Sequence, residues 1–394
     1  MSKIINTIKT ALKETDFVLF FLCTLASAFG ILMVHSATIW ELPEGSIISR
    51  DTRTMLLAVI MGMILAVVIS FIDYNFITKM FPAIGAVCVL MMLATLLFGV
   101  GPAERPDAKT WLVIGNSGLY FQPSELVKIG FIITFGMHIE LVKDKLKELK
   151  HILLLGAHAM IPTGLVVISG DLGSALVFII IFIVMMFCAG VQLRYFILGF
   201  VSVIAAAPAI WYFIFSETQK ERFLGLLYPE RYADDVMFQQ LNGLKAIGRG
   251  GLTGQGLFNG AATQAGTIPE SENDMIFTCV GEELGLLGCI AALGILLAIV
   301  INIMHTGQKS KFDATALMCY GLAAMIAGQV IINIGMCLVI LPVIGITLPF
   351  FSAGGSSNLC IYIGIGLIMS IYRFDKEKEV TNFRLSNITT FSNY

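Results

Sequence analysis

An acidic residue, Asp274, stands where a long polar segment meets an apolar run that begins Met275-Ile276-Phe277. Partial burial of a carboxylate at such a boundary raises its pKa, which would suit it to act as a general base. The same position suits the N-cap of a helix, a role that Asn273 or Asp274 would fill. The residue types alone leave these two interpretations evenly balanced.

A second candidate is a pair of opposite charges near the start of another apolar run. Pro123 suits the first turn of a helix, and Glu125 and Lys128 follow at a spacing that places both on one face of it. Ionisable side chains inside a membrane span are costly, which favours a functional interpretation. The alternative is a structural ion pair that fixes one helix to another. We favour a functional cavity because Asp274 lies on the same side of the membrane.

Several other polar residues could contact an anionic ligand. Asp171 lies in a short turn, where it fits a helix N-cap at least as well as a direct role. Arg222 and Arg249 could pair with phosphate, or they could belong to a solvated face that balances nearby carboxylates. The glycines after Arg249 do not have the GxGxxG spacing and no strand precedes them, so a dinucleotide site is not indicated.

Two further segments combine polar residues with membrane depth. The stretch 342–357 contains two prolines and a Gly-Gly-Ser-Ser run, and irregular backbone is tolerated there only inside protein or along a cavity. Its serines, Ser352 among them, could bind a polar ligand or cap a broken helix. Glu282 and Glu283 lie deeper in the apolar run after Asp274, and at least one is expected to face the bundle interior as a partner for arginine or lysine.

The composition of the 394-residue chain is that of a membrane protein. Hydrophobic residues make up 57% of it, charged residues only 13%, and the mean hydropathy is +0.86, whereas soluble domains carry about 25% charged residues. The absence of a basic stripe in the sequence argues against a nucleic-acid partner. The eight cysteines fall in apolar runs and the five histidines lack ligand spacing, so neither set predicts disulfides or a protein-built metal site.

Ten apolar runs approach the roughly 20 residues that a membrane-spanning helix needs. They cover 17–37, 55–73, 81–100, 123–141, 152–169, 174–190, 194–215, 276–304, 314–341 and 350–372. The predicted fold is therefore all-α, with about ten transmembrane helices within residues 17–373. One long loop, 216–275, joins the seventh and eighth helices.

The distribution of positive charge orients these helices. Fifteen of the 25 lysines and arginines fall in segments on the side of the N-terminus, and four fall in the short loops opposite. Because positive charge is retained on the cytoplasmic side, both termini are expected inside. Residues 1–16 would then form a cytoplasmic segment and 374–394 a loosely ordered cytoplasmic tail. Loop 216–275 and Asp274 would be extracytoplasmic.

Four of these motifs follow one another along the chain. They are Trp111 with Gln122-Pro123-Ser124-Glu125 and Lys128; Asp171-Leu172-Gly173-Ser174-Ala175; Pro269-Glu270 with Asp274-Met275-Ile276-Phe277 and Glu282-Glu283-Leu284-Gly285; and Pro342 through Ser357. Together, over roughly residues 15–375, they resemble the SEDS family of membrane glycosyltransferases, the group of RodA, FtsW and SpoVE. General similarity favours RodA. Met275, Ala353 and Ser169-Gly170 depart from the family pattern without removing a titratable group.

The resemblance implies an enzyme that polymerises lipid II into glycan strands at the outer face of the bacterial cytoplasmic membrane. Its implied partner is a single-span class B penicillin-binding protein. Asp274 would be the family's essential aspartate and the base of an inverting β-1,4 transfer that releases undecaprenyl pyrophosphate. Glu125 and Lys128 would match the paired charges of the fourth helix, and Ser352 a serine of the last outer loop.

The substrate implied by the resemblance predicts further contacts. The expected substrate-binding residues are Glu125, Lys128, Trp111, Arg222, Arg249 and Ser352. Of these, Lys128, Arg222 and Arg249 are the cationic candidates for the pyrophosphate. A divalent cation that bridges the phosphates is compatible with this chemistry, and no other cofactor is expected. A hydrophobic groove between spans should hold the prenyl tail.

Two other classes of function use the same residues. A flippase or transporter of a lipid-linked saccharide would move lipid without forming glycosidic bonds, and would need access from both faces. A non-catalytic scaffold for a cell-wall synthase would tolerate neutralisation of Asp274, Glu125 and Lys128. The candidate polar groups lie near the outer face, which favours one-sided chemistry over transport.

Overall fold

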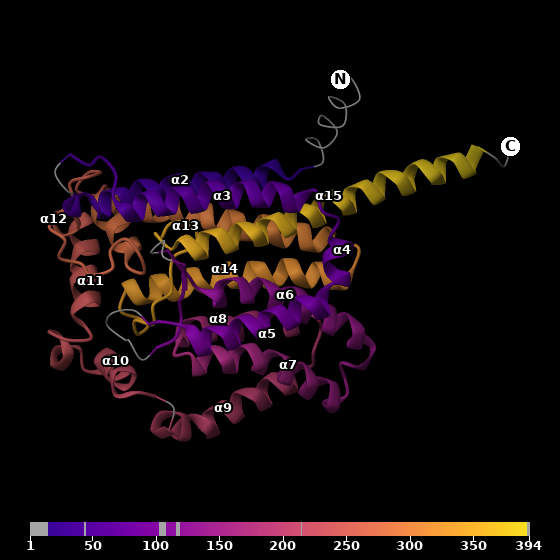
Figure 1. Cartoon of the computed structure of the whole chain (residues 1–394), viewed down its shortest axis with the longest axis horizontal. Coiled ribbons are helices and arrows are strands. Elements are labelled where there is room, and N and C mark those ends of the chain that lie inside the picture. The colour runs from indigo at the N-terminus through magenta and orange to yellow at the C-terminus, as the bar shows by residue number, and fades with distance from the viewer. Residues whose placement is uncertain (1–14, 43–44, 102–107, 116–118, 214, 392–394) are drawn as a thin grey trace.

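The computed structural model describes residues 15–42, 45–101, 108–115, 119–213 and 215–391. Long helices lie side by side in these residues and form one bundle (Figure 1). The ten that form it are α2 (Phe17–Ala37), α3 (Arg50–Ser70), α5 (Phe81–Phe98), α6 (Pro123–Val142), α7 (Leu149–Ile168), α8 (Leu172–Cys188), α9 (Leu193–Phe213), α13 (Ile276–Lys309), α14 (Asp313–Cys337) and α15 (Gly355–Phe391). Residues 1–14 of the predicted N-terminal segment lie outside the described part.

The helices confirm the predicted all-α membrane fold. Eight of them are long and apolar enough to cross a bilayer, and α8 is a shorter apolar helix. The remaining one, α6, has the required length but carries Glu125, Lys128 and Glu140. Each of the ten predicted spans therefore corresponds to one helix in the described chain, and the protein is a multi-pass membrane protein.

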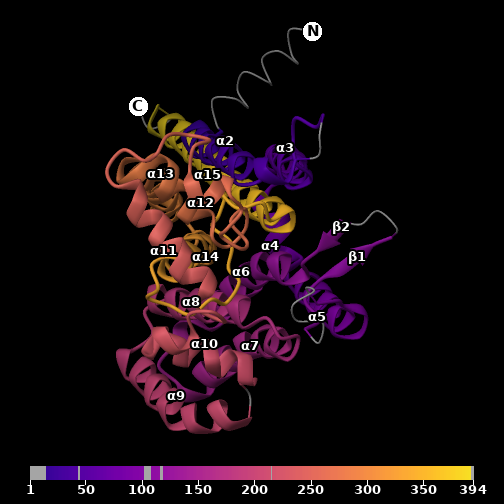
Figure 2. The same ribbon diagram turned by 90° about the vertical axis from the view of Figure 1, so that its left-hand side faces the viewer.

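Small residues allow the central helices to approach closely. Gly62 of α3 faces the ring of Tyr362 on α15, and one turn further along α15 Gly366 faces the backbone of Ala66. Membrane helices associate through such close packing because lipid supplies no hydrophobic driving force between them. As a result α14 and the described part of α15 are mostly buried, and they form the centre of the bundle (Figure 2).

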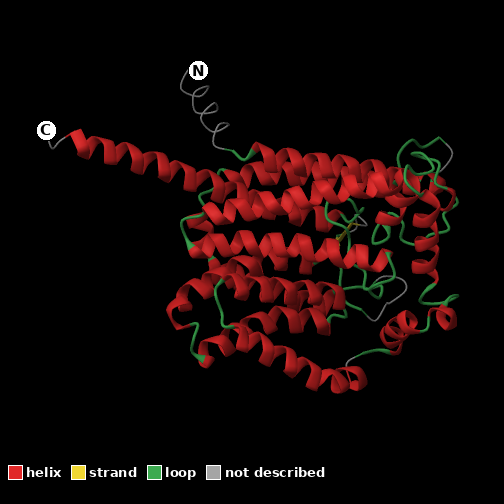
Figure 3. Cartoon of the chain, turned by 180° about the vertical axis from the view of Figure 1, so that it is seen from behind, coloured by secondary structure: helices red, strands yellow, loops and turns green. Residues whose placement is uncertain are grey.

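In contrast, α9 stands at the edge of the bundle, and none of its residues is buried. Its apolar side chains face outward, as expected of a helix that is surrounded mainly by lipid. At the other edge, α15 continues beyond the bundle to Phe391 (Figures 1 and 3). This helix replaces the loosely ordered tail predicted from residue 374. Where α15 leaves the bundle, Asp375 accepts hydrogen bonds from Tyr74 and Ser310, which hold this point of the helix in place.

The segment 216–275 is not a plain loop. It contains helices α10 (Glu217–Leu227), η3 (Pro229–Tyr232), α11 (Phe238–Gly250) and α12 (Ala261–Gln264), which cover one end of the bundle (Figure 1). A capping box begins α10: the Ser216 side chain accepts from the Gln219 amide, and the Gln219 side chain accepts from the Ser216 amide. The sequence prediction missed these helices because they are short, polar and interrupted by glycine.

A small hairpin lies at the same end of the bundle. Strands β1 (Leu112–Ile114) and β2 (Leu119–Phe121) pair antiparallel, with Leu112 opposite Phe121. The hairpin leads directly into α6 and so positions the first turn of that helix. Three short helices complete the described elements: η1 (Ile39–Glu41), α4 (Tyr74–Lys79) and η2 (Lys143–Lys145).

Candidate active site

Asp274 is buried just before α13, with only 8% of its surface exposed. The N-cap of α13 is Met275, and no side chain caps this helix. The N-cap interpretation of Asp274 is therefore wrong. The main-chain oxygen of Asp274 instead accepts a hydrogen bond from Asn333 Nδ2 of α14 (2.8 Å), and its Oδ1 accepts one from Gln239 Nε2 of α11 (3.3 Å). Asp274 is thus held by α11 through its carboxylate and by α14 through its main chain.

The surroundings of Asp274 give it the electrostatics of a base. Burial raises its pKa from 3.8 to about 7, and the negative charge of Glu270 adds to that effect, while Arg222 opposes it. Burial likewise raises the pKa of Glu272 to about 7. A carboxyl group with a pKa near neutrality exchanges protons readily at physiological pH, which is the property required of a general base.

Arg222 acts electrostatically on Asp274, and Ser352 contacts the neighbouring residue Asn273. Arg222 Nη1 donates to the Val343 main-chain oxygen (2.8 Å), so α10 is tied to the segment before α15. Ser352 Oγ donates to the Asn273 main-chain oxygen (2.6 Å) and accepts from Leu348 N (2.8 Å). The Ser352 hydroxyl therefore holds the backbone next to Asp274, rather than projecting toward open space.

The predicted pair on α6 is present and buried. Lys128 Nζ lies 2.8 Å from Glu125 Oε1, and the two side chains are 0% and 5% exposed. The second oxygen of Glu125, Oε2, is also buried and makes no hydrogen bond to any part of the protein that the structure describes. A buried acceptor without a partner is costly, so this oxygen is suited to a donor on a ligand.

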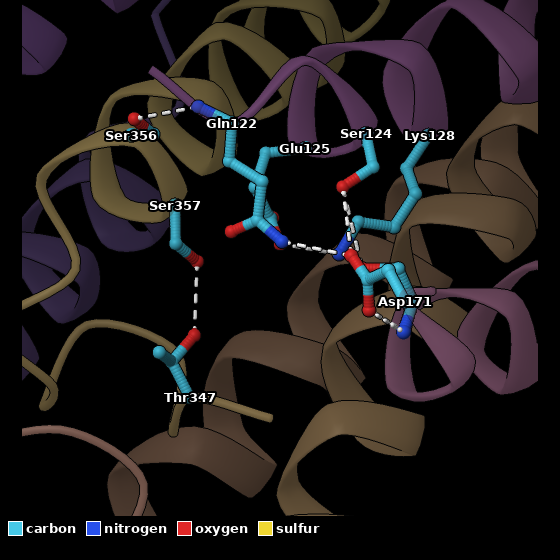
Figure 4. Close-up of polar contacts among 9 residues, drawn as sticks. Gln122, Ser124, Glu125, Lys128, Asp171, Thr347, Ser356 and Ser357 are labelled. Atoms are coloured by element: carbon cyan, nitrogen blue, oxygen red, sulfur yellow. Dashed lines mark hydrogen bonds and ion pairs between the residues drawn. The ribbon is translucent and has the colours of Figure 1, made fainter. Parts of the chain in front are cut away.

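Asp171 joins this pair to a wider polar cluster (Figure 4). Its Oδ1 caps α8 by accepting from Ser174 N (2.9 Å), which confirms the predicted N-cap. Its Oδ2 accepts from Gln122 Nε2 (2.8 Å) and from Ser124 Oγ (3.3 Å). The cap and the cluster therefore use different oxygens of one carboxylate, and a direct role of Asp171 with a ligand stays a prediction.

The segment that precedes α15 faces the same cluster. Ser356 Oγ accepts from Gln122 N (3.2 Å), and Thr347 Oγ1 donates to Ser357 Oγ (3.2 Å). In Figure 4, Thr347 and Ser357 lie across from Gln122 and Glu125. Gln122 appeared in the sequence only as part of a motif and Gln239 not at all, because each contacts its carboxylate across more than thirty residues of chain.

The remaining two predicted contacts lie apart from Asp274. Trp111 is half-buried, and its backbone pairs with Val100 beside the hairpin. Arg249 is 3.6 Å from Glu282 Oε1, which confirms that Glu282 faces the interior toward an arginine. The described structure therefore brings together Asp274, Arg222 and Ser352 in one group, and Glu125 with Lys128 in another, and it places Trp111 and Arg249 in neither.

Comparison with known proteins identifies the family. A family model described as "Cell cycle protein", FTSW_RODA_SPOVE, matches residues 16–377. This chain belongs to that family. The chain is 30% identical over 348 residues to "Peptidoglycan glycosyltransferase MrdB" of Escherichia coli K12. The alignment covers 88% of this chain and 91% of that one. It is also 30% identical over 388 residues to "Probable peptidoglycan glycosyltransferase FtsW" of Bacillus subtilis, which covers 94% of each.

Solved structures share the fold of this FtsW/RodA/SpoVE protein. A chain from "Structural coordination of polymerization and crosslinking by a peptidoglycan synthase complex" aligns with a TM-score of 0.76 and 24% identity, covering 92% of this chain and 98% of that chain. The rod shape determining protein RodA of Thermus thermophilus aligns with a TM-score of 0.66 and 23% identity, covering 91% and 97%.

In this FtsW/RodA/SpoVE protein the glycine-rich part of segment 216–275 supplies hydrogen-bond acceptors at a break in α13. Gly285 leaves the helical conformation at φ 64° and ψ −162°. The amides of Leu286 and Leu287 donate to the main-chain oxygens of Gly251 and Leu252 (2.9 and 3.2 Å). Backbone groups at membrane depth must find partners within the protein. We call this contact between Gly251–Leu252 and Leu286–Leu287 the joint. The role of these glycines is structural, which agrees with the lack of a phosphate-binding pattern.

Two buried glutamates hold the other side of the joint. Glu282 accepts from the Ala262 and Thr263 amides at the start of α12 (2.9 and 2.8 Å). Glu283 accepts from Ser36 Oγ of α2 (2.7 Å) and from Gln264 Nε2 (3.0 Å). Both carboxylates are fully buried and well supplied with donors, so they fix α12 and α2 to α13.

We expect Gly254→Ala to destabilise the joint. Gly254 has φ +78°, and an added Cβ would collide with the main-chain oxygen of Glu283. Alanine at such a position costs more than about 1 kcal/mol. Thermal unfolding in detergent should show a lowered midpoint. The matched control is Gly248→Ala, because Gly248 is exposed in helix α11 with nothing within 4 Å of its Cβ position. An unchanged midpoint for Gly254→Ala would contradict the joint.

Proposed function

We propose that this chain polymerises lipid II into glycan strands, with Asp274 as the general base. The observation that carries the proposal is the buried carboxylate of Asp274, with its pKa raised to about 7, at the mouth of a membrane helix and close to Arg222. Its relatives named peptidoglycan glycosyltransferases support the reaction class. A base at this depth can serve a substrate that is anchored in the membrane and reacts at its surface.

The reaction is a displacement at an anomeric carbon. The acceptor's GlcNAc 4-hydroxyl gives its proton to Asp274, and its oxygen forms a bond to C1 of the donor MurNAc. The C1–O bond to the pyrophosphate breaks, and the electron pair leaves with undecaprenyl pyrophosphate. The α linkage of the donor becomes a β linkage in the product, so the configuration inverts and one base suffices.

The leaving pyrophosphate needs positive charge more than it needs an acid. Among the three predicted cations, Arg222 acts electrostatically on Asp274, whereas Arg249 lies beside Glu282 and Lys128 beside Glu125. We therefore assign the pyrophosphate to Arg222 first. The buried Oε2 of Glu125 would accept a hydroxyl or amide hydrogen of the substrate. A divalent cation that bridges the phosphates remains part of the proposal, and none of the described residues is assigned to it.

The proposal includes an orientation and a partner. The lysine and arginine bias puts both termini in the cytoplasm and the Asp274 end outside. A class B penicillin-binding protein is the proposed partner, supported by the structural likeness to a chain of a peptidoglycan synthase complex. Co-purification of the two proteins, and a rise in polymerisation when the partner is added, would test it.

The function itself is tested by incubating the purified chain with lipid II in detergent. Formation of glycan polymer is expected. A flippase would move lipid II across a vesicle membrane and leave no polymer, and a scaffold would give neither result. Polymer formation thus separates the proposed function from both alternatives that the sequence left open.

The rate of polymerisation should depend on pH through Asp274. A base must be deprotonated to accept the hydroxyl proton, so below a pKa of about 7 the rate should fall about tenfold per pH unit, and above it the rate should level off. A pH series of initial rates measures this. Glu272, whose pKa is also about 7, is the control. The polymerisation rate of the Glu272→Gln variant should still fall at low pH. A rate that no longer depends on pH in this variant would assign the titration to Glu272 instead.

A further inference from the structure

Asp274 belongs to a tight turn, residues 270–275, whose backbone is held from outside the turn. The Met275 amide closes the turn by donating to the Glu270 main-chain oxygen (3.1 Å). Three successive main-chain oxygens inside it accept from distant donors: that of Glu272 from Ala353 N (2.9 Å), that of Asn273 from Ser352 Oγ (2.6 Å) and that of Asp274 from Asn333 Nδ2 (2.8 Å). The position of the Asp274 backbone is therefore set by parts of the chain that follow α13.

Two of these donors belong to the segment 341–353, which lies between α14 and α15. The segment has no regular secondary structure, and irregular backbone at membrane depth is tolerated only inside protein or along a cavity. Two helices pack closely against it through glycines. A Cβ at Gly173 of α8 would meet the Ile344 main-chain oxygen, and a Cβ at Gly30 of α2 would meet that of Phe350. The segment therefore has a defined position in the bundle.

The same segment also binds Arg222. Three of its main-chain oxygens accept from side chains of three different helices: that of Leu341 from Gln240 Nε2 of α11, that of Val343 from Arg222 Nη1 of α10 and that of Ile346 from Asn333 Nδ2 of α14, each at 2.8 Å. Arg222 is thus attached near one end of the segment, and the Asp274 turn is attached at the other end through Ser352 and Ala353.

Asn333 joins the segment directly to Asp274. It is fully buried, and its amide nitrogen donates to the main-chain oxygens of both Asp274 and Ile346. A side-chain amide carries two N–H donors, so both are used by these two carbonyl groups. Replacement of this side chain by an apolar one would leave two buried oxygens without this donor and would disconnect the middle of the segment from the turn.

The reaction makes the separation of Asp274 and Arg222 important. In an inverting displacement the base and the leaving group lie on opposite faces of the sugar ring. The proposed base and the cation assigned to the pyrophosphate must therefore stand a set distance apart, with the donor C1 between them. A misplacement of about 1 Å can lower the rate about 10²-fold. The 341–353 segment is bonded to both residues and to the helices around them.

We propose that the 341–353 segment fixes the separation between Asp274 and Arg222, with Ser352 and Asn333 as positioning residues that act through the Asp274 turn. This rests on the proposed function and deepens it, because it gives Ser352 a role other than the substrate contact predicted from the sequence. The hydroxyl of Ser352 and the amide of Asn333 are both occupied by the protein's own backbone.

Steady-state kinetics with purified lipid II distinguish positioning from binding. Ser352→Ala removes the donor to Asn273 with little change in volume. It should lower kcat about ten- to a hundredfold and leave the KM within about twofold, because the substrate still binds while the base is misplaced. Ser370→Ala is the matched control and should leave both constants unchanged. Ser370 is also buried, and its Oγ donates to the Ile72 main-chain oxygen (2.6 Å) next to α4, at the opposite end of the bundle from α11 (Figure 1).

Two kinetic outcomes would contradict the proposal. A raised KM at an unchanged kcat would make Ser352 a substrate contact. Unchanged values of both constants would show that its hydrogen bond has no influence on Asp274.

A second measurement does not depend on polymerisation. Spin labels on Thr218→Cys of α10 and Thr267→Cys beside the turn report the distance between these two elements, in a chain whose exposed Cys188 is replaced by alanine. Pulsed electron spin resonance should give one narrow distance distribution. Addition of Asn333→Leu should widen this distribution about twofold, because the turn becomes free to move relative to the segment. Addition of Ser370→Ala should leave it unchanged.

The same distribution in the presence of Asn333→Leu would overturn the proposal. If thermal unfolding shows that Asn333→Leu does not fold, Ser352→Ala replaces it and should also widen the distribution. If no chain forms polymer while the distributions widen as expected, the proposed function fails and the positioning role of the segment stands. Polymer formation with distributions that do not change gives the reverse result.

Discussion

Replacement of Asp274 by asparagine is expected to lower the rate of lipid II polymerisation by about 10²- to 10⁴-fold, the range that a general base contributes. The amide cannot take the proton of the acceptor hydroxyl at any pH used in an assay. Its shape is almost that of the carboxyl group, and the hydrogen bond from Asn333 goes to the main chain, so the site should remain assembled. Initial rates with purified lipid II measure the effect.

Two comparisons make this result specific to Asp274. Asp234→Asn changes an exposed acid of the same segment, 216–275, and should leave the rate near that of the unaltered chain. A thermal unfolding midpoint for Asp274→Asn close to that of the unaltered chain would exclude misfolding. Polymer formation at the unaltered rate by Asp274→Asn would remove Asp274 from the mechanism.

Replacement of Lys128 by methionine is expected to destabilise the bundle by about 3–5 kcal/mol and to abolish activity. Removal of one partner from a buried ion pair leaves the other as an uncompensated charge, and that cost exceeds the net stabilisation of the pair. Lys128 is fully buried, and its amine lies 2.8 Å from Glu125. The fall in stability is measured by thermal unfolding in detergent, and the activity by polymer formation.

The double variant Glu125→Gln with Lys128→Met separates structure from function. Removal of both charges relieves the unpaired carboxylate, so most of the stability should return. Activity should stay lost, because the glutamine amide has one acceptor oxygen in place of two and no negative charge to hold a ligand donor. Recovery of activity together with stability would show that the pair only fastens α6 within the bundle.

The parts of this fold that local chemistry determines were predictable from the sequence. Each apolar run of sufficient length became a helix, because every backbone group in lipid must bond within its own segment. The spacing of Glu125 and Lys128 placed them on one face, and the position of Asp171 before an apolar run made it an N-cap. Each of these depends on residues close together in the chain.

The parts that depend on distant contacts were not predictable. Asp274 looked like an N-cap because acids often begin helices, but α13 begins two residues later. The carboxylate of Asp274 accepts a hydrogen bond from Gln239 of α11, and the glycines of α11 argued against a helix there. Ser352 looked free to bind a ligand, yet its hydroxyl is used by Asn273 and Leu348. No spacing in the sequence reports these pairings.

The joint between Gly285 and the glycine-rich turn also constrains how the chain is made. The 34 residues of α13 would make a straight helix of about 51 Å, more than the roughly 30 Å hydrocarbon core, but the break at Gly285 divides it. The amides of Leu286 and Leu287 depend on Gly251 and Leu252, which are synthesised earlier. The order of the chain therefore supplies the partners before the helix that needs them, and α13 completes its hydrogen bonding only when the turn packs against the break at Gly285.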